Sequence, residues 1–257
     1  RDLHFVALTL YHEMFQAMGV AVAFPPSGTI SESLGEIVSR HGMRQLRVAE
    51  SEKFSHVTFF LNGKQSGNFP GEERVRVPSP AGVSFDAVPE LSSREVTRET
   101  IAGLHSGRYG FVVVNYANGD IIGHTANKPA KVRAVEAVDA RLGELLGAAR
   151  QAGFLTIITA DHGAIEEAES PAGAVNISHT TNPVPCILVP ARTSDRSLRL
   201  RRRGTLADVA PTILEAMGLP KPEAMTGRSL IRDASAADRA GRGETQIGVD
   251  VHLAHAV

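Results

Sequence analysis

The chain has 257 residues, of which 42% are hydrophobic and 21% are charged, enough for one large domain or for one domain and part of another. Its formal net charge of -1 gives no general attraction to nucleic acid or to an anionic membrane. No apolar run reaches the roughly 18 residues that a membrane-spanning helix needs, and no secretory signal is recognisable. A single cysteine, Cys186, excludes an internal disulfide and fits a reducing compartment, so we expect a cytoplasmic protein.

Strands and helices alternate along the first hundred residues. Residues 3–11 alternate in polarity as a strand does, and Pro25-Pro26 then break the chain at a linker. A helical pattern begins at Ile30 and ends at Gly42, and Ser51 is a candidate N-cap for the helix that follows. The elements predicted in this part are strands at 3–11, 44–50 and 73–80, and helices at 30–41 and 51–62.

The alternation continues through the rest of the chain and indicates the fold class. The elements predicted here are helices at 93–106, 128–153 and 205–219, and strands at 109–118, 154–161 and 185–190. The strand at 109–118 is continuously apolar, which is typical of burial on both faces. The apolar stripe of the long helix is Val132, Val135, Val138, Leu142, Leu145 and Leu146. We therefore expect an α/β fold, with a mostly parallel sheet covered by helices on both faces.

Groups that bind metals follow two of the most apolar strands. Asp120 and His124 come after the strand at 109–118, and Asp161 and His162 come after the strand at 154–161. His179 lies just before the strand at 185–190. Each group alone is more simply explained as a turn or a surface histidine. Together, at the edge of the sheet where ligands bind, they favour a metal site, and this mixed oxygen and nitrogen set suits Zn²⁺ or Mn²⁺.

Several longer blocks, in unbroken order, resemble one enzyme family. The blocks are "AESEKFSHVTFFLNG", "FPGEERVRVPSP", "NYANGDIIGHT", "AVEAVDARLG", "TADHG" and "SHTTNPVPCILV". They are similar to the cofactor-independent (2,3-bisphosphoglycerate-independent) phosphoglycerate mutases of the alkaline phosphatase superfamily, over about residues 3–231. The resemblance implies an isomerase of glycolysis that interconverts 2- and 3-phosphoglycerate through a phosphoserine. It also implies a small phosphorylated substrate, no nucleic acid or membrane partner, and monomeric full-length relatives.

The same resemblance implies two divalent metal ions and a role for each site residue. It assigns one ion to Asp120, His124 and His179, and the other to Asp161 and His162. The expected ion is Mn²⁺, with Zn²⁺, Co²⁺ and Mg²⁺ as alternatives. Lys53 corresponds to a catalytic and substrate-binding lysine that meets the phosphoryl group or the serine oxygen, although without the resemblance we would interpret it as an exposed lysine in the first turn of a helix.

The resemblance also implies how the chain is divided and what it lacks. Residues 1–27 are expected to be the end of an inserted substrate-binding domain and a linker, 28–231 an incomplete alkaline-phosphatase-like metal domain, and 232–257 a flexible tail. The nucleophilic serine, one acid ligand, the substrate-binding arginines and a strand of the sheet are expected upstream of this chain, so the chain alone is expected to be inactive. Ala164 and Gly119 depart from the family's usual asparagine and proline.

Two other functions remain open on the sequence. The chain could belong to a relative that acts on another phosphate or phosphonate, for which Ala164 and the long C-terminal tail are mild indications. It could also be a non-catalytic metal-binding fragment. The residues that precede this chain in its gene would separate the three hypotheses.

Overall fold

The computed structural model describes most of the chain in seven stretches. They are residues 3–10, 13–24, 28, 30–169, 173–191, 198–232 and 248–252. Among these residues, no helix combines the length and the apolar character that crossing a membrane requires. The linker expected at Pro25-Pro26 lies outside the described residues.

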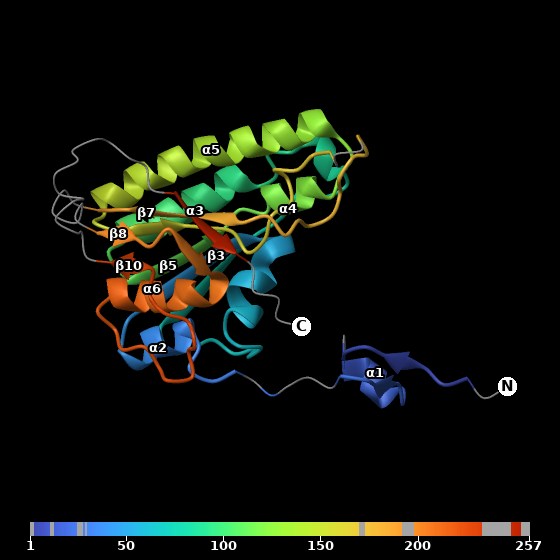
Figure 1. The fold of residues 1–257 in the computed structure, drawn as a ribbon, viewed down its shortest axis with the longest axis horizontal. Coiled ribbons are helices and arrows are strands. Elements are labelled where there is room, and N and C mark those ends of the chain that lie inside the picture. Colours follow the sequence, from blue (N-terminus) through green and yellow to red (C-terminus); the bar gives the residue numbers. More distant parts are fainter. Residues whose placement is uncertain are drawn as a thin grey trace.

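The N-terminal residues form a small unit that lies apart from the rest of the described chain (Figure 1). In this unit β1 (Val6–Ala7) pairs in parallel with β2 (Ala21–Val22), and α1 (Glu13–Ala17) connects them. The strand predicted at 3–11 is therefore confined to two residues. Large apolar side chains of this unit are exposed, among them Phe5 and Leu8, each at 67%. Among its described residues, the unit therefore has little core of its own.

A parallel three-stranded sheet forms the centre of the remaining structure. Its strand order is β4 (Glu72–Val77), β3 (Gln45–Glu50) and β5 (Phe111–Asn115). All three strands were predicted from the sequence, and the register sets Val48 of β3 beside Val75 and Val114. Parallel strands need crossover connections, which the helices between them supply.

A second, mixed sheet contains four strands of the C-terminal half. Its order is β6 (Thr156–Ile158), β7 (Val184–Val189), β11 (Gly248–His252) and β9 (Arg203–Thr205). β7 is antiparallel to both β6 and β11, and β11 is parallel to β9. A separate antiparallel pair joins β8 (Arg199–Leu200) to β10 (Ile231–Arg232). Residues 248–252 thus form a sheet strand, which corrects the expectation of a flexible tail for these five residues, while 233–247 and 253–257 lie outside the described residues.

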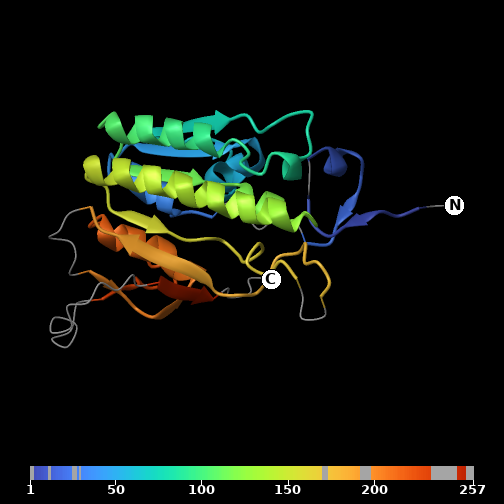
Figure 2. The ribbon, with the colours of Figure 1, turned by 90° about the horizontal axis from the view of Figure 1, so that it is seen from above.

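Helices cover both faces of the central sheet, as Figures 1 and 2 show. The helices are α2 (Leu34–Arg40), α3 (Ser93–His105), α4 (Asn118–Gly123), α5 (Lys128–Gln151) and α6 (Val209–Ala216), with short 3₁₀ turns η3 (Phe85–Ala87) and η5 (Leu206–Asp208). On β5, Val112 and Val114 pack against α3 and α5, whereas Phe111 and Val113 pack against α2 and α6. Alternate side chains of β5 thus pack into two hydrophobic cores, one on each face of the sheet. The predicted fold class is confirmed.

The long helix α5 begins where it was predicted and ends two residues earlier, but two of the six residues of its predicted buried stripe are exposed. Asn127 caps it by accepting a hydrogen bond from the Ala130 amide at 3.1 Å. Val132 and Val135 are 58% and 49% exposed. The side chains buried near this end are instead Ala130, Lys131 and Ala134. Small alanines allow α5 to pack closely on Ile122 of α4, which larger side chains would prevent.

The segment predicted as a regular helix at 51–62 is wound differently. It contains the 3₁₀ turn η1 (Ser51–Lys53) and the π-helical turn η2 (His56–Phe60). Ser51 is not a cap, because its hydroxyl group lies 3.4 Å from the carbonyl oxygen of Val77 instead. The tight first turn buries Lys53, which is 6% exposed. The expected exposed lysine of a first helical turn is therefore a buried cation.

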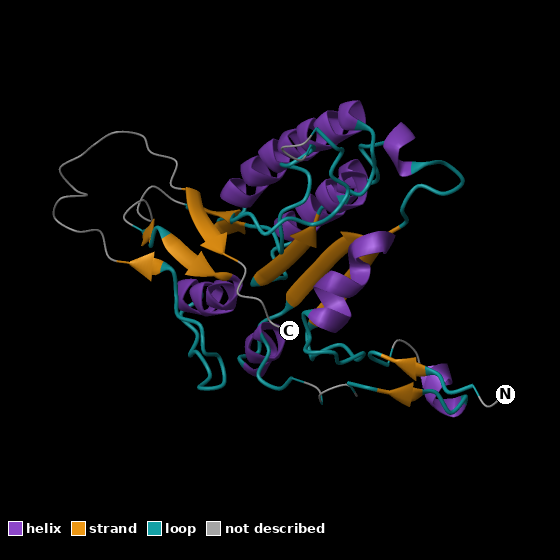
Figure 3. Ribbon diagram, turned by 45° about the vertical axis from the view of Figure 1, so that its right-hand side comes forward, coloured by secondary structure: helices purple, strands orange, loops and turns teal. Residues whose placement is uncertain are grey.

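The two sheets are not joined by backbone hydrogen bonds between β5 and β6. Among the described residues, β5 pairs only with β3, and β6 pairs only with β7. Figure 3 shows the two sheets as separate groups of strands. The prediction that 109–118 is buried on both faces is consequently wrong for most of the strand: Phe111 is buried, but the other residues of β5 are only half-buried.

Candidate metal centre

The topology brings three separate loops to one edge of the structure. The loop after β5 leads into α4, which carries Asp120, and the loop after β6 carries Asp161 and His162. His179 precedes β7 in the chain. Because β7 is antiparallel to β6, its start lies beside the end of β6, so His179 reaches the same edge as His162.

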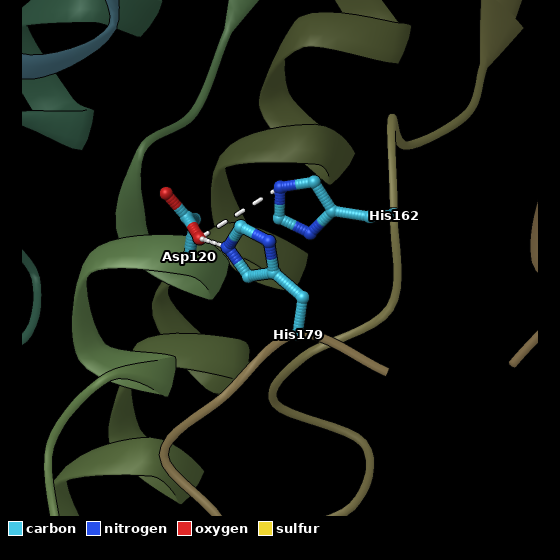
Figure 4. A group of neighbouring side chains, drawn as sticks. All are labelled: Asp120, His162 and His179. Carbon is cyan, nitrogen blue, oxygen red and sulfur yellow. Dashed lines mark hydrogen bonds and ion pairs between the residues drawn. The ribbon is translucent and has the colours of Figure 1, made fainter. Parts of the chain in front are cut away.

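Imidazole nitrogens converge on one carboxylate oxygen at this edge (Figure 4). Oδ1 of Asp120 lies 2.9 Å from Nε2 of His179, 3.1 Å from Nε2 of His124 and 3.8 Å from Nε2 of His162. The His162 and His179 rings are stacked with centroids 3.6 Å apart. Potential ligand atoms of Asp120, His162 and His179 all lie within 4.8 Å of one another, a spacing that could hold a metal ion.

Backbone carbonyls orient two of these imidazoles. Nδ1 of His124 lies 2.8 Å from the Ile177 carbonyl oxygen, and Nδ1 of His162 lies 3.3 Å from that of Gly163. A carbonyl oxygen only accepts, so the proton of each neutral ring belongs on Nδ1 and the lone pair on Nε2. Metal-binding histidines are held in this way by a hydrogen bond to the other ring nitrogen. The donor set therefore fits a divalent metal.

Lys53 neutralises the other oxygen of the same carboxylate. Its ammonium forms an ion pair with Oδ2 of Asp120, and both side chains are largely buried. Burial raises the pKa of Asp120, but the hydrogen bond and charge of Lys53, together with His179 and His124, outweigh burial and leave that pKa below its ordinary value. Asp120 is therefore ionised at neutral pH, and the Lys53 ammonium is its positively charged partner.

Asp161 lies at the margin of the cluster. Its side chain is 58% exposed, and its Oδ2 lies 3.7 Å from Nε2 of His162. His162 instead groups with Asp120 and His179, so the arrangement does not follow the division into two ligand sets that the resemblance implies. The assignment of Asp161 and His162 to a separate ion stays a prediction.

Two polar residues near the centre were not identified from the sequence. His56 lies within the electrostatic field of the cluster: burial lowers its pKa, Lys53 lowers it further, and the charges of Asp161 and Asp120 oppose this. Its position three residues after Lys53 could have indicated that it lies near the same site. Glu166 contacts the loop of His179, and nothing in its sequence position within an irregular loop indicates that contact.

The two departures from the family pattern have a definite structural setting. Gly119 lies in the first turn of α4, and a Cβ atom there would meet no other atom within 4 Å, so no close approach requires glycine. Ala164 is buried, and its backbone amide donates to Oε2 of Glu166 at 2.6 Å. The hydrogen bond at this position is made by the main chain and does not depend on the side chain.

Comparison with known proteins agrees with the geometry. The family model described as "Metalloenzyme superfamily" matches residues 6–221. A 2,3-bisphosphoglycerate-independent phosphoglycerate mutase of Syntrophotalea carbinolica is 49% identical over 228 residues, covering 88% of this chain and 43% of that protein. A protein of the same name from Gloeobacter violaceus is 42% identical over 254 residues, covering 96% of this chain and 46% of its own length.

A solved structure supports the same relationship. The crystal structure of Leishmania mexicana phosphoglycerate mutase at low cobalt concentration matches with a TM-score of 0.77 and 30% identity, over 89% of this chain and 44% of that one. This chain thus spans less than half the length of the relatives that it matches. Since the family model extends over most of its residues, the chain belongs to the metalloenzyme superfamily.

Proposed function

We propose that this chain is the metal-binding part of a 2,3-bisphosphoglycerate-independent phosphoglycerate mutase, an isomerase that interconverts 2- and 3-phosphoglycerate through a phosphoserine. The observation that carries the proposal is the convergence of three histidine Nε2 atoms on one oxygen of Asp120. The name shared by relatives that are 42–49% identical supports the choice of reaction.

The proposed cofactor is a pair of divalent ions, with Mn²⁺ first and Zn²⁺, Co²⁺ and Mg²⁺ as alternatives. Asp120, His124 and His179 would hold one ion. Asp161 and His162 would contribute to the other, together with an acid and a serine from outside this chain. When bound, such ions neutralise charge on the phosphoryl oxygens and on the oxygens that attack and leave.

The residues of this chain would mainly position charge. The carboxylate of Asp120 is kept ionised, and the Nε2 atoms of His124 and His162 are kept free of protons by the carbonyls of Ile177 and Gly163. Lys53 is a buried ammonium at the same edge, suited to donate hydrogen bonds to a phosphoryl oxygen or to the serine oxygen. In the proposed reaction the serine oxygen bonds to phosphorus as the bond to one substrate oxygen breaks. The phosphoryl group then returns to the other hydroxyl of the glycerate.

The remaining proposals follow from the same assignment. Residues 1–27 would close an inserted substrate-binding domain, and 28–231 would form the metal domain. The complete protein would be a monomeric, cytoplasmic enzyme of glycolysis with a small phosphorylated substrate and without nucleic-acid or membrane partners.

A complementation assay tests this function. The purified chain alone, with Mn²⁺, should convert no 3-phosphoglycerate in a coupled assay, because the proposed nucleophile is outside it. Mixing it with the part of the Syntrophotalea carbinolica relative that it does not match should restore turnover. The matched control is the same mixture with the His124→Ala chain, which should remain inactive.

Each contrary outcome has a separate meaning. Turnover by the chain alone would show that the proposed nucleophile is wrong. Hydrolysis of another phosphate or phosphonate by the mixture, without mutase activity, would favour a relative with a different substrate. A mixture that forms a complex and binds Mn²⁺ but turns over no substrate would favour a non-catalytic metal-binding role.

A further inference from the structure

The carboxylate of Glu166 joins the two loops that carry His162 and His179. Its Oε2 accepts a hydrogen bond from the Ala164 amide at 2.6 Å, within its own loop. Its Oε1 accepts from the hydroxyl of Thr180, and from Nδ2 of Asn182 at 3.0 Å, both in the other loop. One side chain thus accepts hydrogen bonds from residues close to both histidines.

The backbones of the two loops meet at the same place. The Thr180 amide donates to the carbonyl oxygen of Gly163 at 2.8 Å, and these two residues form an isolated antiparallel bridge. A Cβ atom on Gly163 would collide with the Thr180 hydroxyl and with Oε1 of Glu166. A side chain at position 163 would therefore displace the Thr180 and Glu166 side chains from this contact, and the bridge lies directly beside His162 in one loop and His179 in the other.

Polar contacts restrain these loops more than packing does. His179 and Glu166 are exposed, and Ala164 is the buried apolar residue next to the bridge among the described residues. The three donors to Glu166 are neutral, so the carboxylate holds the loops by accepting hydrogen bonds and not by forming an ion pair with them. Hydrogen bonds to a charged acceptor are stronger than neutral ones, which suits a carboxylate for holding two exposed loops together.

We propose that Glu166 is a positioning residue that fixes His162 and His179 relative to each other and thereby sets the affinity of the metal centre. The inference deepens the proposed function and rests on its metal site. The stacked rings, 3.6 Å apart, keep both Nε2 atoms near Asp120 only while the two backbones keep their spacing. Loss of the brace leaves every predicted ligand in the chain but lets the loops separate.

The test compares Glu166→Gln with Glu136→Gln, a matched control on the exposed face of α5. Glutamine has the same size, but its amide nitrogen faces a donor where an acceptor is needed. We expect the dissociation constant for Mn²⁺ to rise by about tenfold or more in Glu166→Gln, as for other residues that orient metal ligands, and to stay unchanged in the control. The visible spectrum of the Co²⁺-loaded chain should also change only in Glu166→Gln.

A partner variant separates positioning from general stability. Thr180→Val removes the hydroxyl donor and should weaken Mn²⁺ binding through the same contact. Because both changes break one contact, the dissociation constant of the double variant should be close to that of Glu166→Gln alone, and below the value expected if the two losses added. The Tm of each variant in chelator should stay close to the wild-type value, although its dissociation constant for Mn²⁺ rises. If Glu166→Gln fails to fold, the Mn²⁺ affinity and the Co²⁺ spectrum of Thr180→Val test the inference.

The outcomes separate a failure of this inference from a failure of the proposed metal site on which it rests. A wild-type chain that binds no Mn²⁺ would overturn the proposed site, and the inference with it. A wild-type chain that binds Mn²⁺, with unchanged affinity and Co²⁺ spectrum in both Glu166→Gln and Thr180→Val, would overturn the inference alone.

Discussion

Replacing Lys53 with Met should destabilise the metal-free chain and make it respond more strongly to metal. The change removes the ammonium that faces Asp120, whose side chain is only 16% exposed, and keeps most of the apolar stem. Removing one partner of a fully buried ion pair costs about 3–5 kcal/mol. The neighbouring His124 and His179 side chains are 46% and 48% exposed, so water reaches this site and we expect a smaller loss of about 2 kcal/mol. For a chain of this size that lowers Tm by roughly 4–8 °C.

The assay is thermal unfolding in chelator and in saturating Mn²⁺. A divalent ion at Asp120 supplies the missing positive charge, and in Lys53→Met no ammonium repels it. Mn²⁺ should therefore raise Tm more for Lys53→Met than for the wild type. Lys64→Met, at an exposed position, is the control and should behave as the wild type does. An equal rise in Tm for Lys53→Met and the wild type would refute the idea that Lys53 and a metal ion share Asp120.

Three further predictions address the metal, the core and the effect of pH. His124→Ala should lower the Mn²⁺ content by at least about tenfold in elemental analysis, since one proposed ligand is lost, and unchanged content would exclude this residue. Cys186 is 1% exposed and should resist thiol reagents in the native state, so rapid labelling would show that it is accessible. Burial raises the pKa of Asp208, but hydrogen bonds from the amides of Arg228 and Thr205 outweigh it and lower that pKa. The stabilisation is present above the unfolded pKa and is lost as pH falls through the folded one, so Asp208→Asn should cost about 1–2 kcal/mol at pH 7 in urea unfolding, and this cost should begin to shrink only as the pH falls below about 4 towards the lower folded pKa. A cost that did not change with pH would contradict this account.

Local patterns were enough to predict the central sheet and the position of the centre. Strands such as β3 and β5 were recognisable because continuous apolar residues are bounded by breakers. The rule that ligands collect at the carboxyl ends of strands predicted that Asp120 and His162 lie at one edge, and in the structure their potential ligand atoms are within 4.8 Å of each other. The burial of Cys186 was likewise predictable from its apolar strand.

Other features depend on contacts that no local pattern encodes. The stripe on α5 predicted that Val132 would be buried, but periodicity does not tell which part of a stripe has a partner, and Ala130 packs there instead. The same holds for the π-helical turn that follows Lys53. Glu166 escaped notice because its partners, Thr180 and Asn182, are 14 and 16 residues away in an irregular segment.

The unpaired edges of β5 and β6 have a consequence for cooperativity. Without ladder bonds between them among the described residues, the two sheets are joined by side-chain packing such as that of α6 on Phe111, and we expect them to behave as two units that unfold at different temperatures. Asp120 belongs to the unit of β5, whereas His162 and His179 belong to the unit of β6 and β7. An ion held by Asp120 and His179 would tie the units together. Calorimetry should then record two overlapping transitions in chelator and a single sharper one with metal, so that the ion acts as the cross-link between two halves of one fold.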